Sequence, residues 1–109
     1  MTVSDQMSET DLARIFHALS DPRRLAILAV LQEGECCVCD LAERVDAGQS
    51  LLSFHLKALR EAGLVTDRKD GRWVHYSVNH ALLVGAGDYL AGLVIDARLG
   101  RGHMCCRHG

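Results

Sequence analysis

Three thiols lie within four positions of the segment "GECCVCDLAERV", residues 34–45: Cys36, Cys37 and Cys39. The residues that follow read as a short helix, with Cys37 at its N-cap and Asp40 at N3, as in a capping box. Thiols beside a helix N-terminus are expected to have a lowered pKa, which favours the thiolate that binds soft ions. With no nearby histidine, this set suits trivalent arsenic or antimony, with cadmium or lead next and zinc weaker.

A second pair of thiols, Cys105 and Cys106, lies in the tail "RLGRGHMCCRHG". Trivalent arsenic takes three sulfurs, and the third sulfur of a site built on Cys37 and Cys39 could come from Cys36 or from this tail. The tail pair could also form a separate site, since two thiolates suffice for methylarsenite. Two alternatives remain for the cysteines: small, buried, inert side chains, or a thiol redox switch without metal.

Composition places the chain among ordinary globular proteins. It has 109 residues, of which 49% are hydrophobic and 24% charged, with a formal net charge of −2. We expect a single domain over residues 1–109, with flexible ends at about 1–8 and 100–109. We find no pattern of a signal peptide or membrane span, so we expect a soluble, cytoplasmic protein. In that reducing compartment, five cysteines favour metal binding or redox chemistry over structural disulfides.

The elements that position the thiols follow from hydrophobic periodicity. Asp21 and Pro22 are typical of the N-cap and first position of a helix. Around "DG" at residues 70–71 the period of the apolar residues changes from 3.6 to 2, which is typical of a β-hairpin. The predicted helices cover about residues 9–20, 22–33, 39–45, 49–62 and 80–98, and the predicted hairpin covers residues 64–78. This order is mainly α with a β-hairpin wing, which is the order of a winged helix-turn-helix.

A winged helix-turn-helix reads DNA with the second helix of its motif, here residues 49–62. Phosphate contacts carry affinity more than specificity, and they suit lysine and arginine. Residues 49–79 are basic relative to the rest of the chain, and Trp73 is expected to pack at the base of the wing. The candidate base-reading residues are Gln49, Ser50, Ser53 and His55, and the candidate phosphate-binding residues are Lys57, Arg60, Arg68, Lys69 and Arg72.

Four segments together resemble the ArsR/SmtB family of metal- and metalloid-sensing repressors: "FHALSDPRRLAILAVL", "CVCDLAERV", "QSLLSFHLKALREAGLV" and "DRKDGRWVHYSV". The resemblance covers about residues 10–80, and "CVCDL" is similar to the arsenite-responsive branch. It implies a homodimer, joined through the first and last helices, that binds a palindromic operator and leaves it when inducer binds.

The chain departs from that pattern in several places. The familiar arsenite site has a further cysteine where this chain has Ala42, and Cys36 is an extra thiol. Residues 1–10 lack the cysteines that cadmium and lead sensors add. The last helix offers only Asp88 and Asp96, with no histidine, which argues against the family's zinc site there.

The function predicted is a metalloid-responsive repressor that is released from DNA when trivalent arsenic or antimony binds cysteine thiolates. A redox-sensing repressor and a cadmium- or lead-responsive repressor are the alternatives. An arsenate reductase is disfavoured, because one common type needs Cys-x5-Arg and Arg44 is one residue too near Cys39 and one too far from Cys37. We therefore expect no enzyme, no organic cofactor and no membrane partner.

Overall fold

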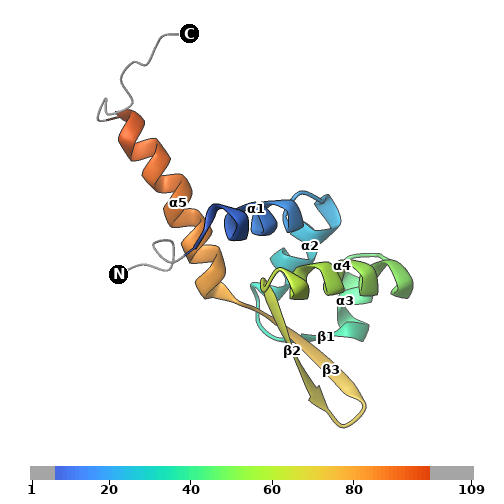
Figure 1. Ribbon diagram of the computed structural model, residues 1–109. Coiled ribbons are helices and arrows are strands. Elements are labelled where there is room, and N and C mark those ends of the chain that lie inside the picture. Colours follow the sequence, from blue (N-terminus) through green and yellow to red (C-terminus); the bar gives the residue numbers. More distant parts are fainter. Residues whose placement is uncertain (1–6, 99–109) are drawn as a thin grey trace.

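The computed structural model describes residues 7–98, and its helices and strands follow the predicted order (Figure 1). Five helices and three strands are present in this part of the chain. The helices are α1 (Glu9–Ala18), α2 (Pro22–Leu31), α3 (Val38–Arg44), α4 (Gln49–Glu61) and α5 (His80–Arg98), and the strands are β1 (Cys36–Cys37), β2 (Val65–Asp70) and β3 (Trp73–Val78). The predicted winged helix-turn-helix architecture is confirmed.

Local signals fix the ends of the first two helices. Ser8 caps α1 in a full capping box with Asp11, and Asp21 caps α2 by accepting from the Arg23 amide, with Pro22 in the first turn. Both arrangements satisfy backbone N–H groups that have no partner inside the helix. The capping predicted for α2 is confirmed.

The sheet contains one strand more than the predicted hairpin. β2 and β3 are antiparallel, and Asp70 pairs with Trp73, so Gly71 and Arg72 form a two-residue loop. Gly71 has φ +63°, a conformation that glycine adopts without steric cost. β1 pairs antiparallel with the other edge of β3, in the order β1-β3-β2. The segment before α3 is thereby joined to the wing.

The core lies where α1–α4 meet the base of the sheet. One face of α4 is fully buried there, as its leucine spacing predicts. Gly63 has φ +83° and turns the chain from α4 into β2. The largest fully buried side chains are Ile15, Ile27, Leu41, Leu52, Leu56, Leu59, Leu64 and Val65.

Helix α5 runs past α1 and projects beyond the rest of the molecule (Figure 1). Phe16 of α1 and Tyr89 of α5 pack with ring centroids 6.4 Å apart. On either side of that contact α5 exposes large apolar side chains: Val84 before it, and Leu90, Leu93, Val94 and Ile95 after it. No helix within residues 7–98 is long and apolar enough to cross a membrane.

Candidate nucleic-acid interface and thiol site

Helices α3 and α4 form a helix-turn-helix whose second helix presents a polar outer face. The turn between them contains Asp46 at φ +51°, and Gly48 is the N-cap of α4. Leu52, Leu56 and Leu59 hold the inner face of α4 in the core. The candidates Gln49, Ser50, Ser53 and Lys57 are all exposed, as expected for residues that contact DNA.

The expected position of His55 on the DNA-facing side is wrong. His55 is only 3% exposed, and its Nδ1 accepts a hydrogen bond of 3.0 Å from Nε of Arg24. Its Nε2 lies 3.9 Å from Oδ1 of Asp21. His55 is polar, but it lies three residues from Leu52 and four from Leu59, and that spacing puts it on the inner face. It links α4 to the start of α2.

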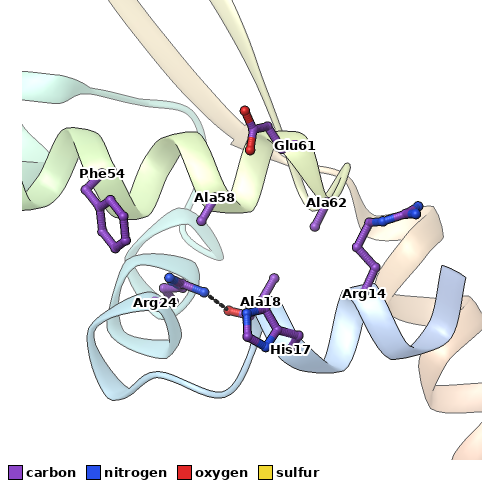
Figure 2. Close-up of a pocket in the computed structure, with 8 residues that line it drawn as sticks. All are labelled: Arg14, His17, Ala18, Arg24, Phe54, Ala58, Glu61 and Ala62. Carbon is purple, nitrogen blue, oxygen red and sulfur yellow. Dashed lines mark hydrogen bonds between the residues drawn. The ribbon is translucent and has the colours of Figure 1, made fainter. Parts of the chain in front are cut away.

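Phe54, the residue before His55, occupies the outer face in its place and was missed by the sequence analysis. Its side chain is 59% exposed. Phe54 also lines a hollow of about 420 Å³ between α1, α2 and α4, with Ala58 and Ala62 further along α4 and Arg14, His17 and Arg24 on the facing helices (Figure 2). Its position in the helix could have identified it. Phe54 is four residues after Ser50 and three before Lys57, and residues at that spacing share one helix face.

The wing carries two kinds of cation. Lys69 and Arg72 are exposed beside the loop, and neither has an ion-pair partner among residues 7–98. Arg68, in contrast, donates two hydrogen bonds, of 3.0 and 2.8 Å, to the carboxylate of Glu35. The Arg68 guanidinium holds the pKa of Glu35 below its usual range. Arg68 therefore ties the wing to the segment before β1.

Arg60 at the end of α4 is also paired. Its guanidinium lies 2.9 Å from Oδ2 of Asp67 on β2. Trp73, expected at the base of the wing, instead adjoins the loop and is 50% exposed. The structure thus leaves Lys57, Lys69 and Arg72 as the unpaired members of the five predicted phosphate-binding cations, within the part of the chain that it describes.

Cys36 points into the core. It is buried, and its thiol lies 3.6 Å from the carbonyl oxygen of Cys37, to which it donates. Burial raises the pKa of Cys36, and the nearby carboxylate of Asp40 raises it further. The expected lowering of the pKa is therefore wrong for this thiol.

Cys37 faces the other side of the sheet, because successive side chains of a strand alternate. It is the N-cap of α3, as predicted, but its side chain makes no capping hydrogen bond. Its cross-strand partner is His75 on β3, and directly opposed residues have their side chains on the same face. The expectation that no histidine lies near the thiols is wrong. It could not be tested from the sequence, because β1 was not predicted.

Cys39 is exposed and lines a second hollow, of about 320 Å³, between the starts of α3 and α4 and the wing. The hollow also contains three of the predicted DNA-contacting residues, Gln49, Ser53 and Arg72. Trp73, Val74 and Tyr76 provide its wall on β3. The thiol and the predicted DNA-contacting side chains therefore share one surface.

No group of three metal-ligating side chains is already assembled within residues 7–98. Cys36, Cys37 and Cys39 point respectively into the core, to the outer face of the sheet and into the hollow. Bringing them around one ion requires β1 to part from β3 or the first turn of α3 to open. Cys105 and Cys106 lie outside the described residues.

A helix-turn-helix with a basic wing defines the class, a DNA-binding regulator. A family model described as bacterial regulatory protein, arsR family, matches residues 21–67. The arsenical resistance operon repressor of Staphylococcus aureus is 48% identical over 77 residues, which are 71% of this chain and 74% of that protein. The chain belongs to the arsR family, whose relatives are transcriptional regulators and not enzymes.

Two further comparisons extend the likeness. The arsenical resistance operon repressor of Escherichia coli K12 is 49% identical over 67 residues, which are 61% of this chain and 57% of that repressor. A homodimeric winged helix-turn-helix DNA-binding domain from Mycobacterium bovis, a possible ArsR-family regulator, superimposes with a TM-score of 0.65 at 29% identity. That match covers 92% of this chain and 97% of the domain.

Proposed function

We propose that this protein is a repressor that binds double-stranded operator DNA as a homodimer and is released when trivalent arsenic or antimony binds its thiols. The observation that carries the proposal is the shared hollow, in which Cys39 lies with Gln49, Ser53 and Arg72. The names of the relatives from S. aureus and E. coli support arsenic as the inducer.

On the DNA side, α4 would enter the major groove with Gln49, Ser50 and Ser53 against base edges. The unpaired cations would hold backbone phosphates, with Lys57 beside the groove and Lys69 and Arg72 on the wing. Arg60 and Arg68 would reach phosphate only by leaving the carboxylates of Asp67 and Glu35. Their contribution to affinity should therefore be smaller than that of Arg72.

On the inducer side, Cys37 and Cys39 would provide two thiolates and a third would come from Cys36 or from the tail pair Cys105 and Cys106. Because the thiols face different ways, binding must distort β1 or the first turn of α3. That turn is poorly capped, so opening it costs little. The displacement would pass through the turn at residues 46–48 to α4.

The free energies required are modest. A coupling of about 1–3 kcal/mol changes operator occupancy several-fold to a hundred-fold. The coupling is reciprocal, so operator DNA should weaken arsenite binding by the same factor.

A titration of operator complexes tests the proposal. Arsenite, methylarsenite, antimonite, cadmium and zinc are added to the wild type and to each Cys→Ser variant, and DNA release is followed by fluorescence anisotropy. We expect release by arsenite or antimonite at the lowest concentrations, abolished by Cys37→Ser and Cys39→Ser. Release by oxidant without metal would instead indicate a redox sensor.

His75 provides a control for the kind of ion. Imidazole suits zinc and cadmium, whereas trivalent arsenic takes sulfur ligands. His75→Gln should therefore leave the arsenite response unchanged. If this substitution removed the response to cadmium or zinc while arsenite had no effect on the wild type, the native inducer would be a divalent metal.

A further inference from the structure

Phe54 is a large apolar residue on the outer face of α4, halfway along the helix. Ser50 lies one turn before it and Lys57 three residues after it, while Leu51 and Ala58 lie on its other side. With 59% of its side chain exposed, Phe54 has more of its surface in water than any other aromatic residue of the described chain. The ring thus borders the polar side of α4, where Ser50 and Lys57 are exposed and suit contact with DNA.

The ring of Phe54 is held in place from beneath. The guanidinium carbon of Arg24 lies 5.8 Å from its centroid in a cation–π arrangement, and Figure 2 draws both side chains. The ring of His55 meets it nearly edge-on, with centroids 5.2 Å apart and planes at 68°. Since Nε of Arg24 also donates to Nδ1 of His55, these three side chains support one another.

The result is an aromatic ring that is fixed at its base and open on its outer side. A preorganised side chain loses less conformational entropy when it binds than a mobile one. In the major groove, the apolar group presented by base edges is the C5 methyl of thymine, and phenylalanine is among the side chains that contact it.

We propose that Phe54 reads a thymine methyl group in each operator half-site, with Arg24 and His55 as positioning residues. The inference rests on the proposed docking of α4 in the major groove. Phe54, and not the buried His55, is then the base-reading residue at this turn of the helix.

Replacing thymine with deoxyuridine tests this, because the substitution removes only the methyl group. Operators are first selected from a random duplex library with the full-length protein, and each thymine is then replaced singly. We expect one position per half-site at which the wild type loses about fourfold in affinity, the effect of one methyl group. Phe54→Ala should bind thymine and uracil duplexes equally, and Phe54→Leu should retain part of the difference.

Leu51→Ala is the matched control, since Leu51 is also an exposed apolar residue of α4. It should keep the preference for thymine at the position that Phe54 reads. Equal binding of all uracil duplexes by the wild type would overturn the inference, and so would an unchanged preference in Phe54→Ala. If no sequence is selected at all, the proposed DNA binding itself fails, which is a different result.

Discussion

At the scale of single residues, Cys37 joins three features of the molecule. It ends β1, it is the N-cap of α3, and it lies opposite His75 on the wing. A thiol is a poor substitute for the hydroxyl that usually caps a helix. The protein thus accepts a weak cap at the point where the proposed site needs a soft ligand.

Cys37→Ser should separate the two roles of this residue. The serine hydroxyl can accept from a backbone N–H in the first turn of α3, so the free energy of unfolding should rise by about 1 kcal/mol. Operator affinity should be unchanged or slightly higher, while arsenite should no longer release DNA. Urea denaturation and anisotropy titrations measure the two effects.

Cys37→Ala is the control, because alanine neither caps nor binds arsenic. It should lose the arsenite response without gaining stability. If Cys37→Ser still releases DNA at the arsenite concentrations that act on the wild type, the sensing site lies in the tail.

The Glu35–Arg68 ion pair predicts a dependence of stability on pH. Arg68 lowers the pKa of Glu35 in the folded state, so the pair stabilises the fold above the ordinary glutamate pKa. That contribution is lost as the pH falls through the lower, folded-state value. In thermal unfolding at low salt, the melting temperature of the wild type should be higher than that of Glu35→Gln at pH 7. The two melting temperatures should converge near about pH 3.

Glu43→Gln is the matched variant, since Glu43 is exposed on α3 and has no ion pair among residues 7–98. It should behave like the wild type across the same range. The effect should be small and should shrink with added salt, because both partners are partly solvated. A difference that grows on acidification would contradict this account.

The residues show where sequence reasoning succeeds and where it stops. The exposure of Gln49, Ser50 and Ser53 follows from the leucine phase of α4, but the same phase should have placed His55 inside. The polarity of His55 suggests the outer face, but its position in the helix decides. The bond to Arg24 that makes its burial tolerable joins residues 31 positions apart, and no local pattern predicts such a bond.

At the scale of elements, the five helices and the hairpin could be predicted, whereas β1 could not. Two residues are too few to show strand periodicity, and their pairing with β3 spans about forty positions. The missing strand hid two features of the thiol site, namely that Cys36 is buried and that His75 adjoins Cys37. Residue types alone suggest the proposed site, but its geometry depends on a contact that the sequence does not encode locally.

Arg68 and Arg72, the two arginines of the wing, should contribute differently to DNA affinity. Arg72→Ala should weaken binding to all DNA sequences and flatten the dependence of log K on log salt by about one charge. Arg68→Ala should change that slope less, since the charge of Arg68 is already matched by Glu35. Filter-binding or anisotropy measurements at several salt concentrations give both slopes. A loss of specificity alone in Arg72→Ala would show that the wing is misplaced.

Gly63 follows the end of α4 in sequence and lies close to Leu82 of α5. It has φ +83°, and an added Cβ would lie 2.8 Å from Cδ1 of Leu82. The methyl group of Leu82 can move, so the backbone conformation is the main cost. Gly63→Ala should lower the free energy of unfolding by about 1–2 kcal/mol in urea denaturation.

Gly87→Ala is the opposite case on α5. Its φ is not in the left-handed range and nothing lies within 4 Å of an added Cβ. Here alanine should raise stability by up to about 1 kcal/mol through helix propensity. If both substitutions destabilised the protein equally, the strain assigned to Gly63 would be wrong.

At the scale of the whole molecule, α5 presents apolar surface that nothing else within residues 7–98 covers. Leu93→Glu should convert the proposed homodimer to a monomer, because a carboxylate would be buried against the partner's helix. Sedimentation velocity at micromolar concentration measures this, and operator affinity should fall because the two reading helices are no longer held about one DNA turn apart. Leu25→Glu, at an equally exposed leucine of α2, should remain dimeric.

The short pairing of β1 with β3 also bears on the kinetics of sensing. Two residue pairs hold this strand, so it should open and close locally far more often than the domain unfolds. If only the open form gathers the thiols, the apparent affinity for inducer is the intrinsic affinity reduced by the open fraction. The association rate should then reach a plateau at high arsenite, set by the opening rate. A substitution at Tyr76, which pairs with Cys36 across the sheet and is not a proposed ligand, should therefore shift the inducer concentration at which the repressor responds.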